Sequence, residues 1–342
     1  MRNSLFVTIV ICLLAFCANA QISAFDKGFD AFQRAKFDNA AHFYSIYIED
    51  NKSPNALFNR GLSYYKLGDF ENAIADYSKV LEIEVDDHEA LYNRGLAYFE
   101  TENYENAIAD YEAVLAISPG YYHAYTGLGL STLQQNKYES AIQYFDTAIE
   151  LYGDSQINFY NRGLAYQAIE NFENAVRDYS VVLRLDDSNI DAFISRANMY
   201  YEMGKYEVSI LDYAEAIYLS PESPALYYNR GISYYSNKQF DEAVNDFTEV
   251  LRYDSTDVNA LWYAALSYKE LSDEGNAIQC YDKVKALNPA YKHLWSIDKN
   301  RLILKKFIKE NWIYTLAIVL LLLASLFFVL RIVKNNKVTE ID

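Results

Sequence analysis

Residues 88–121 read HEALYNRGLAYFETENYENAIADYEAVLAISPGY, and the spacing of their apolar side chains predicts two helices joined by a tight turn. Pro119 ends the second helix, because proline cannot continue one. The same pattern returns every 34 residues in both directions along the chain. Its most regular mark is a small residue in the first helix, found at Gly61, Gly95, Gly129, Gly163, Ala197, Gly231 and Ala265. This period predicts an all-α fold made of repeated helix–turn–helix units, each of which buries its apolar face against its neighbours.

Five positions in each unit define the pattern, and in residues 88–121 they are Gly95, Tyr98, Ala107, Tyr111 and Val114. A 34-residue unit with these small and aromatic positions resembles the tetratricopeptide repeat (TPR) family. The resemblance implies a right-handed superhelical solenoid. The pattern is weaker at Thr132 and at Glu274, and an offset copy around Gly28 adds a unit at the start. We therefore expect about eight repeats, over 21–53, 54–87, 88–121, 122–155, 156–189, 190–223, 224–257 and 258–291.

The first twenty residues have the composition of a signal peptide. A positive charge at Arg2 precedes a short apolar run, and Ala18-Asn19-Ala20 fits a cleavage site. Two alternatives remain open, lipidation at Cys17 and retention of the leader as an anchor. Cleavage would leave Cys280 as the one cysteine of the mature chain, where a small buried apolar side chain is expected rather than a reactive thiol.

The chain changes character after the last repeat. Residues 292–311 are lysine-rich with regularly spaced apolar residues and predict a capping or linker helix. Residues 312–330 are uncharged and mostly apolar, which predicts a transmembrane helix, followed by a short tail at 331–342. The charges on either side do not orient this helix, so the signal peptide decides: the repeats would lie outside the cytoplasm and the tail inside. Signal, array and anchor together resemble bacterial envelope TPR proteins, which implies a periplasmic array; a eukaryotic secretory-pathway protein stays open.

The charge balance narrows the class of partner. The chain has 47 acidic against 30 basic residues, a net charge of −17, and a strongly acidic array repels the phosphates of nucleic acids. A basic protein or peptide is the partner that the charge favours. The four histidines lie in different units without metal-ligand spacing, and no phosphate-binding loop or nucleophile motif is present in the sequence. We expect no enzyme, metal or cofactor.

An arginine and an aspartate sixteen residues apart occur together in five units and are both missing in the others. Because a half-buried arginine without its partner would be costly, this pattern predicts a structural ion pair between the two helices of a unit. The pairs are Arg60/Asp76, Arg94/Asp110, Arg162/Asp178, Arg196/Asp212 and Arg230/Asp246, whereas the corresponding places elsewhere hold Lys27/Phe43, Leu128/Tyr144 and Ala264/Cys280.

Aromatic residues on another face of the first helices are the candidates for binding a partner. They are Phe58, Tyr92, Tyr160, Tyr228 and Trp262 and, seven residues further along, Tyr65, Phe99, Tyr201 and Tyr235. The resemblance implies that this face lines a concave groove that binds peptides. Packing between repeats is the alternative use of the same aromatics. The TPR subclass that grips acidic peptide tails with basic side chains does not match, since its basic places are here aromatic or apolar.

The sequence therefore favours a membrane-tethered scaffold that binds a segment of another protein. Glycan or cell-wall binding through the same aromatics is one alternative, and the sensory subunit of a signalling complex, acting through the short tail, is another. The partner, the pathway and the oligomeric state do not follow from the sequence.

Overall fold

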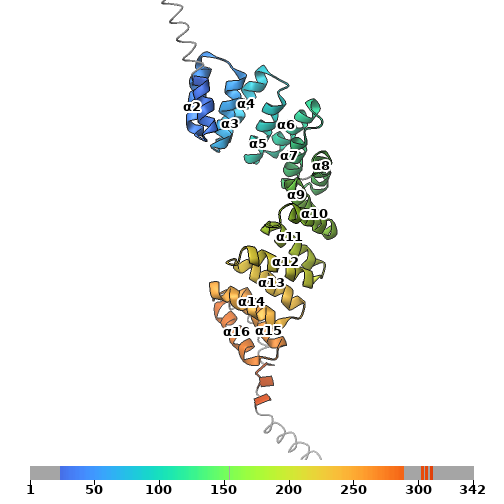
Figure 1. Ribbon diagram of the computed structural model, residues 1–342. Coiled ribbons are helices and arrows are strands. Elements are labelled where there is room, and N and C mark those ends of the chain that lie inside the picture. The colour runs from blue at the N-terminus through green and yellow to red at the C-terminus, as the bar shows by residue number, and fades with distance from the viewer. Residues whose placement is uncertain (1–23, 154, 289–301, 304, 307–308, 311–342) are drawn as a thin grey trace, which may run out of the picture. The chain divides into compact units, whose positions relative to one another are not determined.

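The computed structural model describes residues 24–153, 155–288, 302–303, 305–306 and 309–310 (Figure 1). Regular secondary structure within these residues is helical throughout, which confirms the all-α repeat architecture. Residues 24–33 form the first described helix, and fifteen further helices follow at short intervals within the described residues. Their bounds are α2 Phe37–Asp50, α3 Pro54–Lys66, α4 Phe70–Ile83, α5 His88–Glu100, α6 Tyr104–Ile117, α7 Tyr122–Gln134, α8 Tyr138–Leu151, α9 Gln156–Ala168, α10 Phe172–Leu185, α11 Ile190–Glu202, α12 Tyr206–Leu219, α13 Pro224–Ser236, α14 Phe240–Tyr253, α15 Val258–Glu270 and α16 Glu274–Leu287.

The chain divides into two compact units, residues 1–187 and 188–342. Inside each unit, consecutive helices pack as antiparallel hairpins such as α3–α4 and α13–α14, and each hairpin packs against the next. Every first helix from α3 to α15 begins 34 residues after the previous one and spans 13 residues, whereas the second helices span 14. The sequence period is therefore also the period of the structure.

The turn inside each hairpin has a fixed backbone geometry. The residue before the cap of the second helix adopts a left-handed conformation, at Gly68 with φ +77° and at Glu102 with φ +57°. The next residue then caps the second helix: the Asp69 side chain accepts the backbone N–H of Asn72, and Asn103 does the same for Asn106. A left-handed residue followed by an N-cap reverses the chain in very few residues, so the two helices lie directly against each other.

The core of a repeat consists of one aromatic ring held between first helices. Tyr111 of α6 is 1% exposed, and Ala107 and Val114 on the same face are fully buried. A Cβ atom added at Gly95 of α5 would lie 2.7 Å from this ring, and one at Gly127 of α7 would lie 2.6 Å from it. Glycine is required at both places because the ring occupies the room that a side chain would need. The small residue and the aromatic residue of the repeat pattern therefore pack directly against each other.

Several predicted segments lie outside the described residues: the signal peptide at 1–20, the transmembrane helix at 312–330 and the tail at 331–342. Among the residues that are described, no helix has the length and apolar character needed to cross a bilayer. Part of the predicted capping segment is described, and there Leu302 is 4% exposed and packs with Ala265, Ala277 and Tyr281 of the last repeat. This contact covers apolar side chains at the end of the array.

Candidate functional site

Within each compact unit the first helices of successive repeats lie side by side and form a surface, which we call the first-helix face. Within the first unit α3 contacts α5, α5 contacts α7 and α7 contacts α9, and within the second unit α13 contacts α15. Second helices are not in comparable contact with one another in the part of the chain that the structure describes. Because helices that touch only at one face of a stack lie on its inner side, the first-helix face is the inner face of each unit.

Five of the predicted binding aromatics lie near the N-terminal ends of the first helices, three in the first unit and two in the second, and we call them the N-terminal stripe. Each is half-buried, with one side packed against the fully or almost fully buried aromatic of the second helix in its own hairpin. The ring centroids are 5.6 to 6.0 Å apart in these pairs, which are Phe58–Tyr77, Tyr92–Tyr111, Tyr160–Tyr179, Tyr228–Phe247 and Trp262–Tyr281. The buried partner holds each ring in place while part of the ring stays accessible.

The other four aromatics form a C-terminal stripe at the far ends of the first helices, and they too are half-buried. Each packs against the aromatic residue that starts the second helix of its hairpin, with centroids 5.3 to 5.5 Å apart: Tyr65–Phe70, Phe99–Tyr104, Tyr201–Tyr206 and Tyr235–Phe240. Two of them also reach the next repeat, because the Tyr65 hydroxyl donates to Glu100 Oε1 at 3.3 Å and the Tyr201 and Ser236 hydroxyls are 3.2 Å apart. The stripes therefore serve packing and still present accessible rings.

Three of the stripe tyrosines, Tyr65, Tyr92 and Tyr235, have raised pKa values. Burial raises the pKa of Tyr92 to about 12, and burial together with the nearby Glu100 carboxylate raises the pKa of Tyr65 to about 12. Burial also raises the pKa of Tyr235, with Glu270 adding to the effect. Their hydroxyl groups act as hydrogen-bond donors and acceptors. The formal charge at the C-terminal ends of the first helices comes from exposed side chains, the carboxylates of Glu100 and Glu270 and the ammonium group of Lys66.

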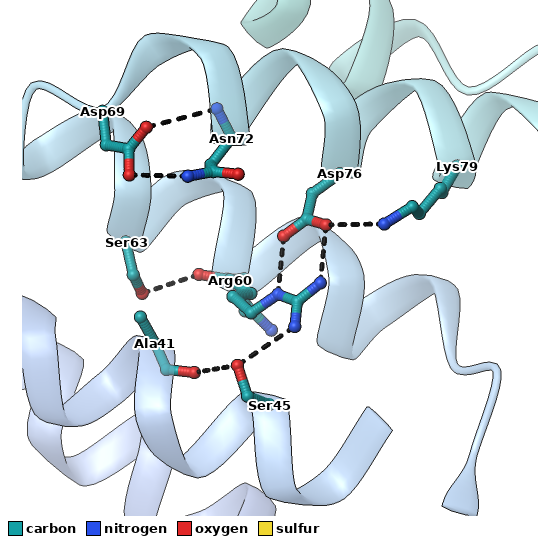
Figure 2. Close-up of polar contacts among 9 residues, drawn as sticks. Ala41, Ser45, Arg60, Ser63, Asp69, Asn72, Asp76 and Lys79 are labelled. Atoms are coloured by element: carbon teal, nitrogen blue, oxygen red, sulfur yellow. Dashed lines mark hydrogen bonds and ion pairs between the residues drawn. The ribbon is translucent and has the colours of Figure 1, made fainter. Parts of the chain in front are cut away.

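The structure places each predicted arginine beside its aspartate in a two-bonded pair. In the first of them, Arg60 donates from Nε to Asp76 Oδ2 and from Nη2 to Asp76 Oδ1, both at 2.7 Å (Figure 2). The Asp76 side chain is 3% exposed and that of Arg60 is 15% exposed. The pairs Arg94–Asp110, Arg162–Asp178, Arg196–Asp212 and Arg230–Asp246 repeat this geometry with bonds of 2.6 to 2.9 Å. Each pair joins the first helix of a repeat to its second helix.

A third partner of these arginines was not predicted from the sequence. The remaining nitrogen of Arg60, Nη1, donates to Ser45 Oγ of the preceding repeat at 3.0 Å (Figure 2). Arg94 donates in the same way to Ser78, and Arg162 donates to the Asp146 carboxylate at 2.5 Å. One guanidinium thus connects three helices and two repeats. The available signal was the residue directly after the second-helix aromatic, which is serine or aspartate in the repeat that precedes each of these three arginines.

Two of the repeats without the ion pair fill the same place with buried or half-buried side chains that carry no charge. Leu128 is 1% exposed, and Tyr144 packs against the cluster that contains it. In the last repeat Ala264 is 2% exposed and half-buried Cys280 packs beside it. Burial raises the pKa of the Cys280 thiol, which leaves the thiol protonated and weakly reactive. Ion pair and apolar pair are therefore two fillings of one site.

The first-helix face carries aromatic rings, hydroxyl groups and carboxylates. Within the described ranges no three His, Cys, Asp or Glu side chains come together in a way that could hold a metal ion. His88 and His123 lie among tyrosine rings, with His88 5.6 Å from Tyr121 and His123 6.0 Å from Tyr92. Burial lowers the pKa of His123, so its imidazole is neutral at pH 7. Rows of rings, hydroxyls and carboxylates on a rigid helical support are suited to binding an extended segment.

Sequence comparisons agree with this architecture. Models described as tetratricopeptide repeat match residues 25–84, 58–122 and 92–156, then 224–257 and 259–290, and a model described as TPR repeat matches 197–238. None of the curated proteins gives a significant match.

Solved structures show the same fold. A crystal structure of a tetratricopeptide repeat protein from Parabacteroides merdae is similar with a TM-score of 0.54 and 20% identity, and the match covers 73% of this chain and 99% of that one. A crystal structure of YrrB, described as a TPR protein with an unusual peptide-binding site, has a TM-score of 0.48 and 22% identity over 55% of this chain and 97% of that one. A crystal structure of MamA protein has a TM-score of 0.47 and 22% identity over 49% of this chain and 92% of that one. At these identities the likeness concerns the fold alone.

Proposed function

This chain belongs to the tetratricopeptide repeat family, and from that premise we propose that it is a protein–protein interaction scaffold whose first-helix face binds an extended segment of another protein. Members of the family commonly act as non-catalytic scaffolds. The segment would lie along the stripe aromatics of one compact unit, with its own side chains between the rings. No step of the proposal needs a catalytic group.

The observation that carries the proposal is the half-burial of the aromatic stripes. Rings that served packing alone would be covered like Tyr77 or Phe247, which are fully buried. Aromatic residues that were exposed by chance would not pack against a buried aromatic in five repeats, with ring centroids 5.6 to 6.0 Å apart. Rigid, partly exposed aromatics bind with little loss of side-chain entropy, which makes them common anchors in recognition surfaces.

The partner segment is proposed to be basic. Glu100, Glu202 and Glu270 occupy the same place at the C-terminal ends of three first helices and are exposed. Glu100 is within hydrogen-bonding distance of Tyr65, so carboxylates and rings form one surface. Lysine or arginine side chains can pair with the carboxylates and lie over the rings as cations. Together with the net charge of −17, this arrangement disfavours acidic segments.

A membrane location forms part of the proposal and depends on the sequence alone. The signal peptide at 1–20 and the apolar stretch at 312–330 support a single-pass protein with its repeats on the non-cytoplasmic side and its C-terminus in the cytoplasm. In a bacterium the repeats would be periplasmic. Protease protection of the tail in sealed vesicles, with digestion of the repeats from the outer side, tests this topology.

The function is tested by capturing partners with the full-length protein in detergent. Solubilised envelope proteins of the source cell are passed over immobilised wild type and over a variant with Tyr92→Leu, Tyr160→Leu and Tyr228→Leu, which keeps apolar contacts but removes the rings. A matched control carries Tyr218→Ala, because Tyr218 lies on the second helix α12 and is 81% exposed. The proposal expects one protein that wild type and control retain, that the triple variant loses, and that high salt weakens. Equal retention by all three would place the binding surface elsewhere.

A further inference from the structure

One position of the N-terminal stripe lacks its large side chain. The corresponding residue is aromatic or isoleucine in the other repeats, at Phe25, Phe58, Tyr92, Tyr160, Ile194, Tyr228 and Trp262, but α7 has Thr126 there. The short threonine side chain does not fill the space that a ring fills elsewhere. A cavity of about 460 Å³ is found at this place.

The cavity has an aromatic and apolar wall. The rings of Tyr122 and Tyr152 stack with centroids 4.7 Å apart and an angle of 15° between their planes, and both line the cavity. Ile157, also in the lining, is 60% exposed and Tyr152 is 50% exposed. Exposed apolar side chains around a concavity offer contact area to an aromatic or apolar ligand group. The described lining residues carry no formal charge at neutral pH, although the chain as a whole is strongly acidic.

A polar pair lies at the same place and is special to this repeat. Asn158 is 0% exposed, and its Oδ1 accepts a hydrogen bond from the Thr126 hydroxyl at 2.9 Å. Its backbone N–H donates to Ser155 Oγ at 3.3 Å, so Asn158 touches two residues of the cavity lining. The corresponding position is alanine or leucine in the other 34-residue repeats: Ala56, Ala90, Ala124, Ala192, Leu226 and Ala260.

The side-chain amide of Asn158 is left with an unpaired group. Its Nδ2 is buried and has no hydrogen-bond partner among the described residues. A buried polar group without a partner costs roughly 1 to 3 kcal/mol, and the alanines of other repeats show that the packing does not require it. The buried Asn158 amide therefore marks this repeat as different from the others beside the cavity, through its bond to Thr126 in the lining.

We propose that this cavity is the anchor site for a tyrosine side chain of the bound partner segment. The inference rests on the proposed function and specifies the chemistry of its ligand. A tyrosine ring supplies the aromatic that the stripe lacks and packs against the Tyr122–Tyr152 stack. Its hydroxyl can form a hydrogen bond with the hydroxyl of Thr126, which lines the cavity, and a phenylalanine cannot do so. An acidic side chain would lose hydration without meeting a positive charge among the described lining residues.

The test uses random twelve-residue peptides displayed on phage and selected against the full-length protein in detergent. We expect the selected peptides to share one tyrosine, and replacing it by alanine in the synthetic peptide to lower the affinity at least about tenfold. Replacement by phenylalanine should lower the affinity several-fold, about as much as one buried hydrogen bond contributes.

Two variants of the protein test whether the tyrosine of the peptide binds in the cavity. Thr126→Phe supplies the missing ring from the protein itself, and Ile157→Glu adds a charge at an exposed position of the lining, where folding tolerates it. Both should lower the affinity for the selected peptide at least about tenfold, while Tyr218→Ala leaves it unchanged. Selected peptides without a shared tyrosine, or affinities that Thr126→Phe and Ile157→Glu do not change, would overturn the anchor site and leave the scaffold function standing. A selection that yields no binding peptide would count against both.

Discussion

Replacing Arg162 by leucine should destabilise the repeat array strongly, and adding Asp178→Tyr should restore most of the loss. Arg162 gives Asp178 two hydrogen bonds of 2.8 and 2.6 Å, and the Asp178 side chain is only 5% exposed. The single variant leaves that carboxylate buried and unpaired, which costs about 3 to 5 kcal/mol. Burial already raises the pKa of Asp178 in the wild type, so the carboxylate has little water to replace its partner.

The double variant reproduces a pair that the protein itself uses. Leu128 and Tyr144 occupy the same two places in the preceding repeat, where Leu128 is 1% exposed and Tyr144 packs against its cluster. Replacing a buried ion pair by apolar residues of similar size is often close to neutral, so we expect the double variant to lie within about 1 to 2 kcal/mol of wild type. Asp146, which also loses Arg162, keeps water because its side chain is 44% exposed.

The assay is urea unfolding of residues 21–300 followed by circular dichroism, with the slope checked because repeat arrays need not unfold in one step. Asp178→Tyr alone should cost about 1 to 3 kcal/mol, since Arg162 keeps its bond to Asp146. The two substitutions then couple by about 2 kcal/mol or more. A double variant as unstable as the sum of the two single variants would refute the reasoning.

Three further predictions follow from the same contacts. Asp246→Ala should destabilise the array about 1 kcal/mol more than Asp178→Ala. After Asp178→Ala, Arg162 still has the Asp146 carboxylate as a partner, whereas after Asp246→Ala, Arg230 has only Ala214 at the equivalent place. Equal urea midpoints for the two variants would contradict this. Gly129→Ala should cost about 1 to 3 kcal/mol, because a Cβ there would lie 2.5 Å from the Phe145 ring, whereas Gly120→Ala, with nothing within 4 Å, should leave the melting temperature nearly unchanged. Alkali should unfold the array. The folded pKa values of tyrosines such as Tyr92, at about 12, lie above the unfolded value near 10, so their contribution is complete below pH 10 and falls as the pH rises toward 12. Tyrosinate absorbance and circular dichroism should then change together in that window, and full ionisation without loss of helix would contradict the account.

The fold was predictable because one period repeats along the chain. The small residue at Gly95 and the ring at Tyr111 are sixteen residues apart in sequence and meet inside one hairpin, so their joint recurrence contains the geometry. The five Arg and Asp positions recur together for the same reason. When a contact joins two residues of the same repeat, the pair recurs at the same spacing in successive repeats and can be recognised in the sequence.

Contacts between repeats were harder to predict. Ser45, Ser78 and Asp146 differ in type, and their bonds to the arginines depend on how one hairpin packs on the next. The cavity beside Thr126 exists because this position lacks a large side chain. The repeat motif specifies which residues are present and does not indicate where a missing side chain leaves space. The half-burial of the stripe aromatics could be established only from the positions of the rings in the structure. Helical spacing in the sequence is compatible with a packing role and with a binding role.

The central claim is that the first-helix face holds the partner, and site-specific photo-crosslinking tests it most directly. The photoreactive residue p-benzoylphenylalanine replaces Tyr228, half-buried on that face, or Tyr218, on the second helix α12, in the full-length protein expressed in its own cell. Both positions hold a tyrosine, so the substitutions are matched in size. The account predicts a defined protein adduct after irradiation at position 228 and none at position 218. An adduct at 218 alone, or the same adduct at both positions, would contradict it.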